Sequence, residues 1–322
     1  MSEIVVQVED LHTSFFTRRG EVKAVDGVTF FVRQGETFGI VGESGCGKSV
    51  TGLSIMRLLP EPSGQIIAGK IIFEGVNLVE LDRKKMRAYR GRMISMILQD
   101  PMTSLNPVYT IGDQIREPIR LHQALPENMI EPEIIESLRL LKIPTPETIL
   151  GNYPFQLSGG MRQRVVGAIA MSCRPHLLIA DEPTTALDAT IQAQYLALFK
   201  DIQEKTNVAI IFITHDFGVI ANMCHRVGVM YAGKIVETAP TREIFKAPRH
   251  PYTVALINSV PTLERKDERL FSIEGQPPSM LNLPPGCPFA PRCAFAKDTC
   301  RQQEPPEVKV GSDHTVSCWR VD

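Results

Sequence analysis

Hydrophobic and polar positions follow different periods along the first half of the chain. IVVQV, AVDGVTFFV and TFGIV, all between residues 4 and 41, are short runs rich in β-branched residues and predict strands. The stretch KSVTGLSIMRLL, residues 48–59, has helical spacing and ends before Pro60, so it predicts a helix. Between about 110 and 150, IGDQIREPIRLH and EIIESLRLLK also predict helices.

Strand character returns in the second half of the chain, at LLIA (177–180), VAIIFIT (208–214) and RVGVMYAGKIVE (226–237), with helical stretches between them. Continuous apolar strands that alternate with helices are typical of a mostly parallel sheet with helices on both faces, which is an α/β fold. After about residue 260 the amino-acid composition changes, and GQPPSMLNLPPGCP is rich in Pro and Gly. This composition predicts a linker or a small irregular module.

Length and composition restrict the class of protein. The chain has 322 residues, of which 43% are hydrophobic and 22% charged, so we expect one large globular domain with an appendage, or two domains. The net charge of -1 disfavours a nucleic-acid binder. No apolar run approaches the ~18 residues that cross a bilayer. MSEIVVQVED lacks the pattern of a secretory signal, so we expect a cytoplasmic protein.

The stretch VGESGCGKSV contains a G-x-x-x-x-G-K-S phosphate-binding loop, the P-loop, between a predicted strand and a predicted helix. Its backbone N–H groups and the helix N-terminus attract phosphate oxygens. Lys48 is expected to reach the β- and γ-phosphates of ATP, and the Ser49 hydroxyl to bind Mg²⁺. Cys46 contributes its backbone only. The expected nucleotide-binding residues here are Gly42, Ser44, Gly45, Cys46, Gly47, Lys48, Ser49 and Val50.

Two carboxylates follow a second buried strand in LLIADEP. The carboxyl end of a strand in an α/β sheet is the edge where ligands bind. Asp181 is therefore predicted to hold Mg²⁺, and Glu182 to polarise the attacking water.

LSGGMRQR, residues 157–164, resembles the signature of ATP-binding-cassette (ABC) ATPases. The likeness runs over roughly residues 4–245 and includes the P-loop, ILQDP, LLIADEP, TTALD and IFITHD in the order that the family shows. It implies a P-loop NTPase core with an N-terminal antiparallel β part and a helical subdomain at about 101–160. The implied domains are a nucleotide-binding domain at 1–260 and a C-terminal extension at 261–322.

The same likeness implies roles for single residues. Phe15 would stack on adenine, with Phe16 as the neighbouring alternative. Gln99 would contact Mg²⁺ or the attacking water, and His215 the γ-phosphate. Asp188 would bridge two subunits, because the family forms head-to-tail dimers in which a signature contacts the ATP of the partner subunit. The signature residues in this role are Ser158, Gly159, Gly160 and Gln163.

Two further stretches, DPMTSLNPVYTIGDQI (100–115) and APRHPYTVALINSVP (247–261), resemble the oligopeptide/dipeptide branch of importers, where RHPYT marks lineage. This likeness implies a peripheral ATPase at the cytoplasmic face of the membrane. Its partners would be a second ATPase subunit, two transmembrane permease subunits and, indirectly, an extracytoplasmic peptide-binding protein, with no nucleic acid. Import of nickel or another solute, and a soluble ABC module for assembly or nucleic-acid processing, are the alternatives.

Four cysteines, Cys287, Cys293, Cys300 and Cys318, gather near the C-terminus with the spacing C-x5-C-x6-C-x17-C. This spacing fits neither the paired pattern of structural zinc sites nor the common ferredoxin runs, so it indicates only four thiolates that could converge. Likeness to dipeptide-importer subunits implies a [4Fe–4S] cluster, with Zn²⁺ and reduced thiols or a disulfide pair as alternatives. Cys173 and Cys224 are interpreted as core residues.

Overall fold

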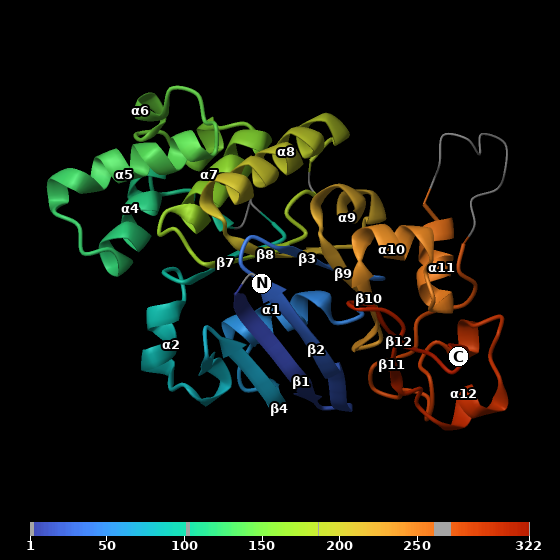
Figure 1. Ribbon diagram of the computed structural model, residues 1–322. Helices are drawn as coiled ribbons and strands as arrows, with labels where there is room; N and C mark the ends of the chain where they lie inside the picture. The colour runs from blue at the N-terminus through green and yellow to red at the C-terminus, as the bar shows by residue number, and fades with distance from the viewer. Residues whose placement is uncertain (1–2, 101–103, 186, 261–271, 322) are drawn as a thin grey trace. The chain divides into compact units, whose positions relative to one another are not determined.

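The computed structural model describes residues 3–100, 104–185, 187–260 and 272–321 (Figure 1). The described residues form two compact units, each assembled from several stretches of the chain. Unit 1 comprises residues 3–6, 32–36 and 80–212, and unit 2 comprises residues 7–31, 37–79 and 213–321.

Most of one four-stranded sheet belongs to unit 2. Its order is β2-β1-β4-β5, and β4 and β5 are antiparallel, with Ile72 opposite Asn77. The strand at 64–73 was not predicted from the sequence, because only part of it has an apolar run. The strands are β1 (Ile4–Thr17), β2 (Gly20–Arg33), β4 (Gly64–Phe73) and β5 (Val76–Asn77).

Unit 2 also contains a mixed set of strands in the order β11-β12-β10-β9-β3. Only the β3–β9 pair is parallel, and β9–β10, β10–β12 and β11–β12 are antiparallel. The single run predicted at 226–237 is in fact a hairpin. Ala232 and Gly233 have φ values of 47° and 84° and form its turn. The strands are β3 (Thr37–Val41), β9 (Arg226–Tyr231), β10 (Lys234–Pro240), β11 (Glu307–Lys309) and β12 (Thr315–Ser317).

The strands of unit 1 follow the order β6-β7-β8, and β6 and β7 are parallel with Ile94 opposite Leu177. Every residue of β7 and of β8 is buried, as their continuous apolar sequences predict. The strands are β6 (Ile94–Ile97), β7 (Leu177–Asp181) and β8 (Ala209–Thr214), of which the last two residues of β8 belong to unit 2.

The segment between about 111 and 171 is helical, and α4, α5 and α7 pack against one another (Figure 1). Buried isoleucines at helical spacing, Ile111, Ile115 and Ile119, form the inner face of α4. The helices of unit 1 are α2 (Arg83–Tyr89), α4 (Ile111–His122), α5 (Glu127–Leu140), α6 (Pro146–Ile149), α7 (Gly159–Met171) and α8 (Ala189–Thr206), with the short 3-10 turn η2 (Pro154–Gln156).

The helices of unit 2 are short, and polar side chains cap several of them. Asp216 accepts hydrogen bonds from two N–H groups at the start of α9, and His250 accepts one at the start of α11. The helices of unit 2 are α1 (Lys48–Met56), α9 (Phe217–Met223), α10 (Thr241–Lys246), α11 (Pro251–Asn258) and α12 (Asp298–Gln302), with the 3-10 turn η3 (Ala290–Arg292). Another 3-10 turn, η1 (Leu78–Glu80), has residues in both units.

Each unit has an aromatic core. In unit 1 the Phe199 ring contacts Tyr195 and Phe212 edge-on, at centroid distances of 4.9 and 5.9 Å. In unit 2 Phe30 stacks on Phe38 at 4.9 Å. Among the residues that the structure describes, no helix is long and apolar enough to span a membrane.

Candidate nucleotide site and cysteine pocket

The P-loop of unit 2 connects the buried strand β3 to helix α1. Its glycines are required by close backbone contacts as well as by conformation. A Cβ at Gly42 would lie 2.1 Å from the carbonyl oxygen of Met230, and one at Gly47 would lie 2.2 Å from that of Ala24. Gly47 also has a φ of 111°, which side chains rarely adopt. The loop is therefore fitted against neighbouring backbone on both sides.

The Lys48 side chain lies against the P-loop and bonds to the backbone of that loop. The side chain is buried, and Nζ donates to the carbonyl oxygens of Gly42 at 2.8 Å and Glu43 at 3.0 Å. A buried ammonium with carbonyl partners is ready to exchange them for the stronger, charge-assisted bonds that phosphate oxygens offer. Cys46 beside it is also buried, and burial raises the pKa of its thiol. The thiol therefore stays neutral, in agreement with a backbone role.

Two predicted catalytic residues contact each other in unit 1. Asp181 is the last residue of β7, and Glu182 follows in a left-handed conformation with φ 45°. The side-chain amide of Gln99, just after β6, donates to Glu182 Oε2 at 3.2 Å. The Thr185 hydroxyl donates to the same oxygen at 3.1 Å. Parallel strands end at one edge of the sheet, and this brings the amide and the carboxylate together.

The signature segment lies at the start of α7. Ser158 and Gly159 are exposed, and Ser158 Oγ caps the helix by accepting from the N–H of Met161 at 3.3 Å. Gln163, one turn further, is 1% exposed, and its amide donates to the carbonyl oxygen of Pro183 at 2.5 Å. In this chain Gln163 therefore supports the segment that follows Glu182, while Ser158 and Gly159 face solvent.

The other residues predicted to contact nucleotide or a partner subunit are Asp188 in unit 1 and His215, Phe15 and Phe16 in unit 2. Asp188 is exposed and caps α8 by accepting from the N–H of Ile191 at 3.0 Å. His215 is exposed in the bend after β8. Phe15 is half-buried beside Gly64, whose Cβ would lie 2.9 Å from its ring, and the neighbouring Phe16 is 47% exposed.

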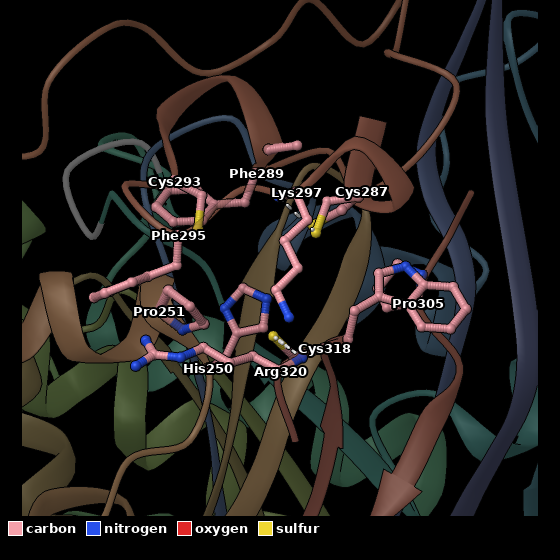
Figure 2. A pocket seen from close by; sticks show the side chains of 13 residues that line it. His250, Pro251, Cys287, Phe289, Cys293, Phe295, Lys297, Pro305, Cys318 and Arg320 are labelled. Carbon is pink, nitrogen blue, oxygen red and sulfur yellow. Dashed lines mark hydrogen bonds between the residues drawn. The ribbon is translucent and has the colours of Figure 1, made fainter. Parts of the chain in front are cut away.

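All four C-terminal cysteines line one pocket of unit 2 (Figure 2). The pocket includes the apolar side chains of Pro251, Phe289, Phe295 and Pro305. His250 also lines it. The cysteines come from the loop before η3, the loop after it, α12 and the position directly after β12, and are Cys287, Cys293, Cys300 and Cys318.

Backbone N–H groups already point at two of these sulfurs. The Lys297 N–H donates to Cys300 Sγ and the Arg320 N–H to Cys318 Sγ, each at 3.5 Å. Burial raises the pKa of Cys287 to about 11, and the neighbouring Cys318 and Cys300 thiols add to the shift. Within the described residues, no group of three or more His, Cys, Asp or Glu side chains is arranged to hold a metal ion.

Comparison with known proteins identifies the family. The profile described as ABC transporter matches residues 25–185, and the profile described as Oligopeptide/dipeptide transporter, C-terminal region, matches residues 236–300. The chain is 51% identical to the dipeptide transport ATP-binding protein DppD of Bacillus subtilis (strain 168), across 99% of this chain and 96% of the relative. This chain belongs to the ABC transporter family.

Another relative supports the same family, and two solved structures show the same fold. The chain is 52% identical to the oligopeptide transport ATP-binding protein OppD of Bacillus subtilis (strain 168), across 98% of this chain and 88% of the relative. Among solved structures, the ATP-binding cassette MJ0796, a dimer bound to ADP and Pi, superposes with a TM-score of 0.65 and 24% identity, over 74% of this chain and 99% of that one. CbiO1 from Clostridium perfringens superposes with a TM-score of 0.64 and 25% identity, over 76% and 92%. The predicted ABC ATPase fold is confirmed.

The sequence alone did not identify every residue that supports the nucleotide site of this ABC chain. Thr185 donates to the proposed catalytic carboxylate, and Tyr252 and Arg292 both contact the P-loop residue Glu43. RHPYT was interpreted only as a mark of lineage, yet its histidine lines the cysteine pocket and its tyrosine contacts the P-loop. No motif signals the Arg292 contact, because its partner lies 249 residues away.

Proposed function

We propose that this chain binds MgATP between its own P-loop and the signature of a second ATPase subunit, and hydrolyses it. Lys48 would neutralise phosphate charge, and Ser49 and Asp181 would hold Mg²⁺ with Gln99. His215 would contact the γ-phosphate, Phe15 the adenine ring, and Asp188 the partner subunit.

In the partner's site, Ser158, Gly159 and Gly160 would supply an anion-binding helix start. Gln163 would support this helix start from the protein interior, because its side chain is buried.

One observation carries the catalytic part of the proposal: two donors, Gln99 and Thr185, bond a single oxygen of Glu182. These bonds restrict the rotation of the carboxylate at the carboxyl end of β7. A carboxylate held in one orientation can polarise a water molecule for in-line attack, which is most of what phosphoryl transfer asks of a protein.

The proposed cargo is a di- or oligopeptide, and hydrolysis would drive its import. Supporting this are the names of the relatives, which are dipeptide and oligopeptide transport ATP-binding proteins, and the match of residues 236–300 to the C-terminal region of such transporters. The chain would lie at the cytoplasmic face of the membrane against two permease subunits, with a second ATPase subunit as its dimer partner. An extracytoplasmic binding protein would deliver the peptide.

We further propose that residues 261–322 form a C-terminal extension whose four cysteines hold a [4Fe–4S] cluster. Two observations support this: four thiols, the ligand type of such a cluster, line one largely apolar pocket, and N–H groups donate to two of the sulfurs. Bound there, the cluster would supply a covalent cross-link for a segment with little core of its own. Zn²⁺ is the alternative that metal analysis distinguishes.

A transport assay tests the function as a whole. Cells that lack this chain but retain its permease, binding-protein and partner ATPase genes would receive either wild type or Glu182→Gln. Wild type is expected to restore uptake of a labelled dipeptide, whereas Glu182→Gln is expected to assemble without restoring it. Uptake of nickel in place of the peptide, or no change in uptake of either, would contradict peptide import.

A further inference from the structure

Arg292 of the C-terminal segment forms a bidentate ion pair with the P-loop. Its Nη1 and Nη2 atoms donate to the two carboxylate oxygens of Glu43 at 2.6 and 3.0 Å. The Arg292 side chain is only 4% exposed, so water screens this pair weakly. Both residues belong to unit 2, although 249 positions separate them in the sequence.

Every N–H group of the Arg292 guanidinium has a partner. In addition to the two bonds to Glu43, Nη1 donates to the Tyr231 hydroxyl at 3.3 Å. Nε donates to the Glu274 carbonyl oxygen at 3.0 Å, and Nη2 to that of Ile273 at 3.4 Å. Five donors with five acceptors fix the plane of the guanidinium and, through it, the Glu43 carboxylate. The bonds that Arg292 donates to Glu43 also raise the pKa of the guanidinium, which stays charged.

A second contact reaches the same P-loop residue from helix α11. The N–H of Glu43 donates to the Tyr252 hydroxyl at 3.0 Å. The Tyr252 ring packs against the rings of Tyr231 and Phe289, at centroid distances of 4.5 and 5.3 Å. Phe289 lies between Cys287 and Arg292 in the sequence and lines the cysteine pocket. The pocket wall is therefore continuous with the residues that hold Glu43.

Glu43 is placed to transmit this constraint to the phosphate site. Its carbonyl oxygen accepts from Lys48 Nζ at 3.0 Å, so the side chain and backbone of one residue connect Arg292 to the phosphate-binding lysine. Arg292 itself is the last residue of the five-residue stretch between Cys287 and Cys293. Any rearrangement of that stretch must move either the guanidinium or the loop bonded to it.

We propose that Arg292 is a positioning residue of the P-loop, through which the four-cysteine segment sets the affinity of this chain for nucleotide. The proposal rests on the nucleotide site proposed above. It predicts two reciprocal effects, because coupling between two sites acts equally in both directions. Loss of the Arg292–Glu43 pair weakens nucleotide binding, and bound nucleotide protects the cysteine segment.

The first test measures the Kd of a fluorescent ATP analogue for the full chain. Arg292→Gln and Glu43→Gln are each expected to raise the Kd about tenfold, within the usual range of coupling between sites. The double variant is expected to resemble either single one, since both remove the same pair. Arg301→Gln, an exposed arginine of the same segment, is the matched control and keeps the wild-type Kd. Lack of nucleotide binding by wild type and Arg301→Gln would contradict the nucleotide site itself.

The second test measures alkylation of the C-terminal cysteines of the metal-free chain by iodoacetamide, residue by residue, with and without ATP. In wild type, ATP is expected to slow alkylation of Cys287 and Cys293 several-fold, and in Arg292→Gln this protection is expected to disappear. Arg292→Lys keeps the charge and loses the bidentate geometry, so it should recover only part of the affinity. Tyr252→Phe removes only the hydroxyl and should weaken binding less. A folded Arg292→Gln chain with wild-type Kd and intact ATP protection would overturn the proposal, and so would equal effects of Arg292→Gln and Arg301→Gln.

Discussion

Gln99 Nε2 lies 3.2 Å from Glu182 Oε2 and donates a hydrogen bond to it, across 83 positions of sequence. The contact joins a residue after β6 to one after β7, at the edge where these parallel strands end. It places an amide, which can bind Mg²⁺ or water, beside the carboxylate proposed as the general base. The bond restricts the orientation of the Glu182 carboxylate, the group proposed to polarise the attacking water.

Glu182→Gln is expected to abolish turnover while ATP binding remains. The amide keeps an oxygen that can accept from Gln99 and Thr185, so the fold is preserved, but it cannot take a proton. Steady-state ATP hydrolysis should fall by about 10²- to 10⁴-fold, the usual contribution of a general base. Phosphate release and ATP retention by the full transporter measure this. Glu131→Gln, an exposed glutamate of the same unit, is the control, and unchanged hydrolysis in Glu182→Gln would contradict the assigned role.

Lys48→Ala is expected to weaken binding of the nucleotide itself. The buried ammonium bonds the Gly42 and Glu43 carbonyl oxygens and would exchange them for phosphate. A charged hydrogen bond contributes about 1.5–3 kcal/mol, so the Kd for ATP should rise by about 10- to 150-fold. Isothermal titration with ATP measures it. Lys70→Ala, an exposed lysine on β4, should bind ATP as wild type does; equal Kd values for the two variants would exclude a phosphate contact.

Gly159→Ala separates folding of this chain from contact with a partner. A Cβ at Gly159 meets nothing within 4 Å, so the monomer should keep its wild-type Tm. Hydrolysis by the assembled dimer should nevertheless drop, because the added methyl would enter the space proposed for the partner's phosphates. Gly151→Ala, which also has open space, is the control for both measurements. Full activity of Gly159→Ala in the dimer would show that the signature does not approach nucleotide so closely.

Gly42→Ala is expected to damage the P-loop from within. Its Cβ would lie 2.1 Å from the Met230 carbonyl oxygen, and backbone cannot yield as a flexible side chain does. We expect a loss of about 1–3 kcal/mol in the free energy of unfolding, together with weaker ATP binding. Urea denaturation of the purified chain measures the first quantity. A stability equal to that of Gly151→Ala would be inconsistent with the tight backbone contact.

The cysteine pocket yields a prediction about metal content. Chain purified without oxygen should contain about four iron and four sulfide per polypeptide and absorb broadly in the visible range. Cys300→Ser should lose most of this iron, whereas Cys173→Ser, a half-buried cysteine outside the pocket, should keep it. Stoichiometric zinc without sulfide would replace the cluster by the alternative ion.

In the metal-free chain, the Cys287 thiol should make stability depend on alkaline pH. Burial raises its pKa from 9.0 to about 11, so the folded state holds a proton that the unfolded state loses first. This contribution is fully present below pH 9 and is lost as pH rises toward 11. The free energy of unfolding should therefore fall by about 2 kcal/mol more in wild type than in Cys287→Ala over that interval. Parallel pH profiles for the two chains would contradict the shifted pKa.

The sequence was sufficient to predict the strands, loop and helices that carry the nucleotide-binding motifs, because these elements depend on local chemistry. The glycines of the P-loop, the buried strand before Asp181 and the capping serine of α7 all act on their immediate neighbours. Periodicity also located β3, β7 and β8 within one residue of their observed bounds. The hairpin at 226–240 was wrongly predicted as one strand, because alanine is not a residue type that indicates a positive φ, yet Ala232 has one.

Long-range relationships were beyond the reach of sequence patterns. The spacing of the four cysteines gave no pairing pattern, although all four line one pocket. Arg292 stands beside a cysteine and carries no motif, yet its guanidinium donates five hydrogen bonds, two of them to the P-loop residue Glu43. Such contacts follow from where the tertiary fold places distant segments, and a single sequence does not encode that placement in any short pattern.

The pairing of β12 with β10 has a practical consequence for handling the protein. Thr238 lies opposite Thr315 and Glu237 opposite Val316, so the last strand covers a hairpin that would otherwise end in open backbone. A polypeptide shortened before Thr315 would leave that hairpin with an uncovered edge, where unpaired amides recruit foreign strands and seed aggregation. Removal of the last eight residues, 315–322, should therefore cost solubility as well as the Cys318 thiol.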